Sequence, residues 1–181
     1  MSEQTSPALS PGFKRARRVS GALWLLLTIG FWLTSLSFIA AAAVLFIRHT
    51  ITFSLDGIAI HVAQADWTGH ALIVLAILLT AIPLLFVLHL ARGVFGKFAR
   101  GEVFAEATIA GIRQAAIWLI VAAIAATVAD NLLDLAAGLH PVFPLRHYLR
   151  VSWLIFGAIA YVAAYVMAEA RRMGNENAGF F

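Results

Sequence analysis

Four long apolar runs constrain this chain more than any other feature of its sequence. The hydrocarbon core of a bilayer takes about 20 apolar residues of helix, and the 181-residue chain contains four runs of that order. The first run is much longer than the ~7–15 apolar residues of a cleaved signal peptide, so we expect it to stay as a span. The sequence predicts an all-α integral membrane protein with four transmembrane helices, at about 21–47, 71–91, 113–134 and 151–170.

The rest of the chain is short and polar, and leaves room for one domain only. Residues 1–19 are rich in small, polar and basic residues and are expected to form a disordered basic tail. Residues 20–172 are expected to form a single four-span domain, and 173–181 a C-terminal tail. The basic cluster Lys14–Arg18 is expected to anchor the first span at the headgroups, with binding of anionic lipid as the functional alternative.

The lysines and arginines predict the orientation of the chain. Ten of the 13 lie on the side of the N-terminus if the four spans alternate in direction. Because cytoplasmic loops are enriched in these residues, we expect both termini in the cytoplasm and the protein in a bacterial inner membrane. The three on the other side are Arg48, Arg146 and Arg150.

The first outer loop carries the strongest local signal. "ITFSL-DG-IAIHV" places two alternating five-residue runs around Asp56-Gly57, which is typical of a two-residue hairpin turn. We therefore expect a small β-hairpin, with Leu55 opposite Ile58 and an apolar face that packs on the helices or the membrane surface.

Two carboxylates mark the outer end of the third span. Asp130 and Asp134 share one helix face because they are four residues apart. Asp130 lies 17 residues, or roughly 25 Å of helix, beyond Arg113, which places it near the outer edge of the hydrocarbon. We expect the two to form an ion-pair cluster with Arg146 and Arg150, and keep a proton or cation site as the alternative.

Other residues give weaker signals. Pro83, inside the second span, is a candidate hinge or simply a packed proline. No cofactor is expected, because a bis-histidine haem needs histidines on facing spans and the third and fourth spans contain none. A metal site from His61, His140, His147 and Asp134 lacks any known ligand spacing. No catalytic motif is present, so neither an enzyme nor nucleic-acid binding is expected.

The connection between the second and third spans is the most distinctive polar stretch. Its sequence "FARGEVFAEATIAGIRQAAIW" predicts a turn at Arg100-Gly101 followed by an amphipathic helix in the inner interface. It is either a structural elbow or a cytoplasmic docking surface. The candidate docking residues are Phe98, Arg100, Glu102, Phe104, Glu106 and Arg113.

Two segments resemble a known family. "GKFARGEVFAEATIAGIRQAAIWLI" and the closing "YVMAEARRMGNENAGFF" are similar to a bacterial four-helix membrane family catalogued as domain of unknown function 2975. The resemblance covers residues 20–180 and implies a regulatory or stress-related membrane partner. The family often has Ser or Thr after the Phe as a helix cap; here Ala105 follows, and Thr108 is expected to cap a start displaced by a turn.

Together these features predict a non-enzymatic scaffold or regulatory protein that binds the bilayer and a membrane-protein partner or a second copy of itself. The alternative is a small transporter or channel component that uses the Asp130/Asp134 face.

Overall fold

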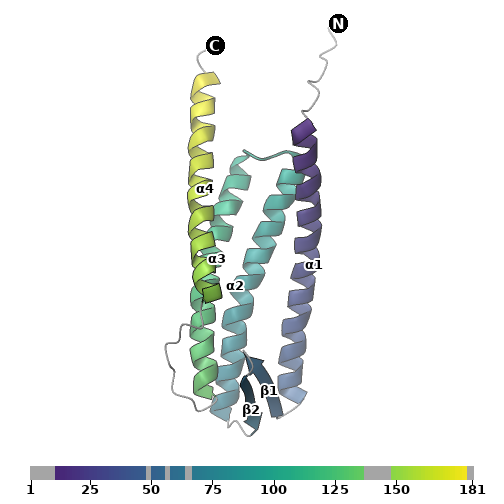
Figure 1. The fold of residues 1–181 in the computed structure, drawn as a ribbon, viewed down its shortest axis with the longest axis vertical. Coiled ribbons are helices and arrows are strands. Elements are labelled where there is room, and N and C mark those ends of the chain that lie inside the picture. Colours follow the sequence, from purple (N-terminus) through teal and green to yellow (C-terminus); the bar gives the residue numbers. More distant parts are fainter. Residues whose placement is uncertain (1–10, 48–49, 56–57, 64–66, 137–147, 179–181) are drawn as a thin grey trace.

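The computed structural model of the protein describes the backbone of residues 11–47, 50–55, 58–63, 67–136 and 148–178. Side chains are described for 15, 17–44, 67–136 and 151–176. Within these ranges the chain forms four long helices in an up-and-down arrangement (Figure 1). They are α1 (Pro11–Ile47), α2 (Trp67–Arg100), α3 (Glu106–Ala136) and α4 (Tyr148–Ala178).

All four helices are long and apolar enough to cross a membrane. Each predicted span lies inside one of them, but every helix extends beyond its apolar run. The predicted disordered tail is therefore wrong over 11–19, which belong to α1, and the predicted C-terminal tail is helical to Ala178. The thickness of the hydrocarbon core determines how long the apolar run must be. It does not limit the helix, because polar residues can continue the helix into water.

The expected fold class also needs a correction at the hairpin. Over the residues whose side chains are described, the chain is helical except for the turn at 101–105, and it contains no strand. The backbones of β1 (Thr50–Leu55) and β2 (Ile58–Ala63) do pair antiparallel, with Leu55 opposite Ile58. Their side chains lie outside the described residues, so the packing of the predicted apolar face stays a prediction. Two paired strands alone form no independent layer, so the predicted fold class is corrected to a four-helix one without a β-element.

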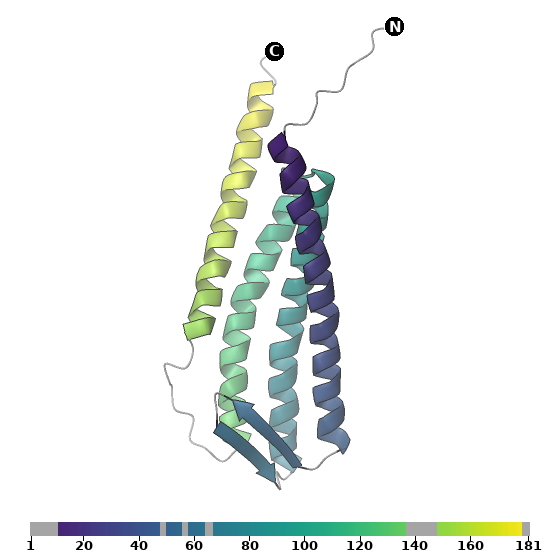
Figure 2. The same ribbon diagram turned by 45° about the vertical axis from the view of Figure 1, so that its right-hand side comes forward.

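The helices form a row, because each main contact is between helices that are consecutive in the sequence. α1 packs on α2, α2 on α3, and α3 on α4 (Figure 2). The inner pair approaches closely because small residues lie between the backbones, as is common in membrane helices. The buried small residues of α2 and α3 are Gly69, Ala76, Ala81, Ala116, Ala122, Ala123, Ala125, Ala126 and Ala129.

Large apolar side chains lie on the outside of this row. On α1, Leu25, Trp32 and Leu36 are exposed, and on α4, Phe156 and Val162 are exposed. A protein in water would leave such a surface uncovered at a large cost in free energy, whereas lipid chains cover it. This inside-out distribution fits a multi-pass membrane protein.

α4 is shifted along α3 toward the end where α2 and α3 are joined. Gly157 faces Ala116 and Ile120, and Arg171 reaches Glu106 at the first turn of α3. Consequently α4 begins beside the second half of α3 and extends past the α2–α3 connection (Figure 1).

Pro83 lies within α2 without interrupting it. The helix runs unbroken from Trp67 to Arg100, and Pro83 is buried. Pro83 is therefore a packed residue of a continuous helix, and its predicted role as a hinge stays a prediction.

Candidate functional site

The connection between α2 and α3 is a short turn, Gly101–Ala105, which we call the elbow. Gly101 has a φ angle of 88°, in the left-handed region that favours glycine. Its N–H donates to the Phe98 carbonyl at 3.0 Å, and the Glu102 N–H donates to the Lys97 carbonyl at 3.0 Å. These two bonds define a Schellman motif, which ends α2 and fixes the direction in which the chain leaves it.

The start of α3 is tied back to the same turn. α3 begins at Glu106, so Ala105 occupies the cap position and its carbonyl accepts from the N–H groups of Thr108 and Ile109 at 2.9 and 3.1 Å. Thr108 is completely buried, and its hydroxyl donates to the Glu102 carbonyl at 2.7 Å. The expectation that Thr108 caps a displaced helix start is therefore wrong. Thr108 lies in the first turn of α3 and binds the elbow instead.

Replacing Thr108 with valine is expected to loosen the elbow. The variant keeps the shape of the side chain but leaves the Glu102 carbonyl without its hydroxyl donor, which should cost about 1 kcal/mol of unfolding free energy. The measurement is reversible unfolding in mixed micelles.

Thr28→Val is the matched control, because the Thr28 hydroxyl bonds only to the Trp24 carbonyl within its own helix. Equal losses of stability in the two variants would contradict a special role for Thr108.

All four helices contribute side chains to the elbow end of the molecule. Arg17 of α1 donates from Nε to the Ala99 carbonyl at 2.8 Å, and Lys97 of α2 donates from Nζ to the Ala107 carbonyl of α3 at 2.8 Å. Arg171 of α4 lies 3.5 Å from a carboxylate oxygen of Glu106. Arg17 and Lys97 thus donate hydrogen bonds to carbonyls at the end of α2 and the start of α3. Arg17 and Arg171 link the outer helices α1 and α4 to the inner pair.

The predicted docking residues do not form one amphipathic helix. Phe98 and Arg100 belong to the end of α2, whereas Glu106 and Arg113 belong to α3 itself. The separate interfacial helix is therefore wrong, because the Schellman motif turns the chain directly from one long helix into the next.

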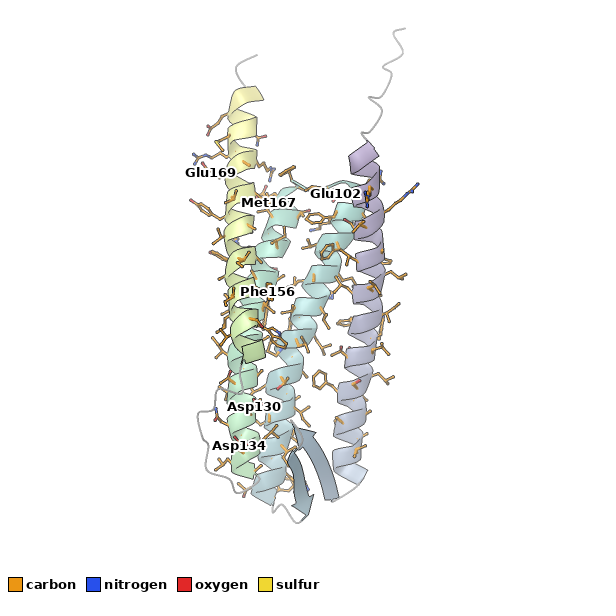
Figure 3. The ribbon with its side chains drawn as sticks, in the orientation of Figure 1. Glu102, Asp130, Asp134, Phe156, Met167 and Glu169 are labelled. Atoms are coloured by element: carbon orange, nitrogen blue, oxygen red, sulfur yellow. The ribbon has the colours of Figure 1, made fainter. Side chains whose placement is uncertain are left out.

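The elbow nevertheless brings four of those six residues together. Glu102, labelled in Figure 3, and Phe104 are exposed within the turn. Arg100 and Glu106 flank the turn, and Arg100 Nε lies 3.1 Å from a Glu102 carboxylate oxygen. Phe98 is half-buried, with its ring edge-on to Phe95 at 5.9 Å.

The sequence did not predict the hydrogen bonds that hold the elbow in place. Thr108 was expected as a helix cap and Arg17 as part of the headgroup cluster, whereas Thr108 bonds to the backbone of the elbow and Arg17 to the end of α2. Thr108 carried a usable signal, a lone hydroxyl in the first turn of an apolar helix. Nothing in the sequence indicates that Arg17 reaches Ala99, since this depends on how α1 packs against α2.

The two aspartates lie away from the elbow. Asp130 and Asp134 are half-buried in the second half of α3, toward the opposite end of the molecule (Figure 3). The side chains of Arg146 and Arg150, their predicted partners, lie outside the described residues, as do His61, His140 and His147. Among the described side chains, no group of three or more potential ligands can hold a metal ion. The ion-pair cluster and the transport alternative stay predictions.

Long apolar helices that bury small residues against one another and expose large ones define a multi-pass membrane protein of the four-helix type. Comparisons with protein-family models, with curated proteins and with solved structures give no match, so the resemblance to domain of unknown function 2975 stays a prediction.

Proposed function

We propose that this protein acts in the membrane by binding a protein partner at the elbow, in a regulatory or scaffolding role without catalysis. One observation carries the proposal. Phe104 is 59% exposed on a turn that hydrogen bonds hold in shape. A large exposed aromatic ring on a preorganised turn is typical of an anchor for protein recognition, because little entropy is lost when it binds.

The charges around the ring favour a protein over lipid. Glu102 and Glu106 flank Phe104, and both carboxylates are exposed. Arg100 and Arg171 lie 3.1 and 3.5 Å from these carboxylates, so the charges around the ring balance and offer anionic headgroups no net attraction. A protein pocket with an apolar centre and a rim that carries both charges matches this surface in shape and charge.

We further propose that the elbow faces the cytoplasm. α1 starts and α4 ends at the elbow end of the molecule (Figure 1), and ten of the 13 Lys and Arg residues belong to this side if all four helices span the membrane. The excess of basic residues on the cytoplasmic side of membrane proteins supports this orientation.

A photo-activated crosslinker in place of Phe104 tests the proposal in cells. We expect it to capture a distinct protein that the same crosslinker at Trp67 does not capture. Trp67 is the matched control, because it is 88% exposed at the far end of α2. Capture of nothing but further copies of this chain, or of the same proteins from both positions, would overturn the proposal of a dedicated partner.

A further inference from the structure

α1 and α4 form the two edges of the row of helices (Figure 2). α1 makes its main contacts with α2, and α4 makes its main contacts with α3. Each edge helix therefore has a face that is turned away from the rest of the protein, and a further helix can add to the row at either edge.

The face of α1 that meets α2 carries Arg17, Trp24 and Phe31, which are seven residues apart. Residues two and five positions after each of these lie on the opposite side of the helix, because each residue adds about 100°. Arg15, two positions before Arg17, lies on that opposite side too. These residues are all exposed, and we call them the α1 stripe: Arg15, Val19, Ala22, Leu26, Ile29, Leu33 and Leu36.

The free face of α4 follows the same spacing. α4 meets α3 at Gly157, Ala164 and Arg171, which are again seven residues apart. Residues two and five positions after each of these lie on the opposite side, as does Ile155, two positions before Gly157. Glu169 is half-buried and the others are exposed. We call this set the α4 stripe: Ile155, Ile159, Val162, Val166, Glu169, Met173 and Glu176.

The two stripes lie at the same level along the molecule. Contacts between neighbouring helices relate their levels: Trp24 with Gly96, Val94 with Gly111, and Glu106 with Arg171. Counting residues along the helices between these contacts places Leu26 level with Val166, and Val19 level with Met173, to within about one helical turn. α1 and α4 run in opposite directions (Figure 1). The stripes of two copies in one membrane can therefore pair over their whole length.

Lipid chains cover only part of each stripe. The apolar runs of the inner helices end at Arg92 and Arg113, which lie at one level because Val94 faces Gly111. By the same count Val19 and Met173 lie about nine residues, or roughly 13 Å, beyond that level, whereas the headgroup region is about 5–7 Å deep. Both side chains are about half exposed. A protein surface can cover them there, since lipid chains do not reach that far.

The charges at the elbow end of the two stripes are complementary. α1 contains no Asp or Glu, and none of the ion pairs among the described side chains involves Arg15. Glu169 and Glu176 share one partner, Arg172, at 2.8 and 3.4 Å, so the α4 stripe keeps an excess of negative charge. The count of levels places Arg15 beside Glu176. Two α1 stripes would bring arginine against arginine, whereas an α1 stripe on an α4 stripe brings opposite charges together.

We propose that copies of this chain associate side by side in the membrane, with the α1 stripe of one copy packed on the α4 stripe of the next. Leu26 packs against Val166, and Arg15 pairs with Glu176. The contact joins two different faces, so each added copy leaves a stripe open for another and the assembly can grow beyond a dimer. This interface is separate from the docking surface at Phe104, and either can exist without the other.

Disulfide crosslinking in native membranes between two differently tagged copies tests the proposal. The chain contains no cysteine, so Leu26→Cys in one copy and Val166→Cys in the other report a single contact. We expect this pair to crosslink at least about fivefold more than Leu26→Cys with Tyr165→Cys, because disulfide geometry is specific. Tyr165 is the matched control, since it is 70% exposed at the same depth but about 100° around the helix from Val166.

A charge exchange tests the elbow end of the same interface. Glu176→Arg in the copy with Val166→Cys should lower crosslinking about threefold, because an attraction becomes a repulsion. Arg15→Glu in the copy with Leu26→Cys should restore it. Both positions are exposed, so neither substitution disturbs the packing within one copy. A further loss on adding Arg15→Glu would show that the two residues do not meet.

Three other results would overturn the proposal. Strong crosslinking of Leu26→Cys with itself would indicate that two α1 helices meet. Equal crosslinking of Leu26→Cys with Val166→Cys and with Tyr165→Cys would indicate random collision. No crosslinking from this pair, or from Leu33→Cys with Ile159→Cys, would show that the two stripes face lipid.

Discussion

Replacing Gly157 with leucine is expected to detach α4 from the other helices. A Cβ atom at this position would lie 2.7 Å from Ile120 Cγ1 and 3.1 Å from the Ala116 carbonyl oxygen. The carbonyl belongs to the α3 backbone and cannot rotate away, so α4 itself must move. α4 makes its main contacts with α3 alone, and we expect a loss of about 2–3 kcal/mol, the upper part of the range for overpacked sites.

A cysteine pair at Glu106 and Arg171 measures this separation. The chain contains no cysteine, so a short bifunctional maleimide would report only this pair, whose native side chains lie 3.5 Å apart. We expect Gly157→Leu to abolish most of the crosslinking. Gly174→Leu, on the same helix with nothing within 4 Å of the added Cβ, should preserve it. Undiminished crosslinking in Gly157→Leu would contradict the close packing of α4 on α3.

Replacing Gly101 with valine is expected to disrupt the elbow. The φ angle of 88° places a Cβ atom against the backbone, which costs roughly 1–2 kcal/mol for an ordinary residue and more for a β-branched one. The substitution also strains the two hydrogen bonds of the Schellman motif. We expect a total loss of about 2 kcal/mol in unfolding free energy.

Reversible unfolding in mixed micelles measures that loss, and Gly93→Val is its control. Gly93 lies within α2, eight residues before Gly101, and nothing lies within 4 Å of the Cβ that a substitution would add. The control therefore adds the same side chain near the elbow without the strained φ angle, and we expect no loss of stability from it, since valine is a better helix former than glycine. If the two variants lose the same stability, the left-handed glycine is not what fixes the elbow.

The sequence predicts the number and place of the helices because each apolar run must by itself be long enough to cross the hydrocarbon core. Four apolar runs therefore become four helices regardless of how they pack. Gly101 also carries a local signal, since a glycine after a basic, apolar helix is the usual residue for a left-handed cap.

Features that depend on packing between helices could not be predicted in this way. The shift of α4 along α3 follows from Gly157 fitting against Ala116 and Ile120, and a hydropathy pattern contains no such information. The same is true of Arg17, whose bond to Ala99 joins residues 82 positions apart. The predicted helices were too short, because a helix can continue into water beyond its last apolar residue. α1 begins at Pro11 and α4 ends at Ala178, both outside the predicted spans.

The elbow was located correctly but given the wrong local structure. Its charge pattern is amphipathic over 98–113, which predicted an interfacial helix. The structure divides those residues between the end of α2, a turn and the start of α3. Exposed charges there reflect the ends of two long helices, and this leaves Phe104 at the turn as the distinctive apolar residue.

We propose that the fixed shape of the elbow presents Phe104 to a partner protein. The most direct measurement compares crosslinking from a photo-activated residue at position 104 in the wild-type background and in Gly101→Val, in cells that contain equal amounts of each. We expect the partner to be captured from the wild type and lost from Gly101→Val, while Gly93→Val still captures it. Equal capture from all three proteins would contradict the claim.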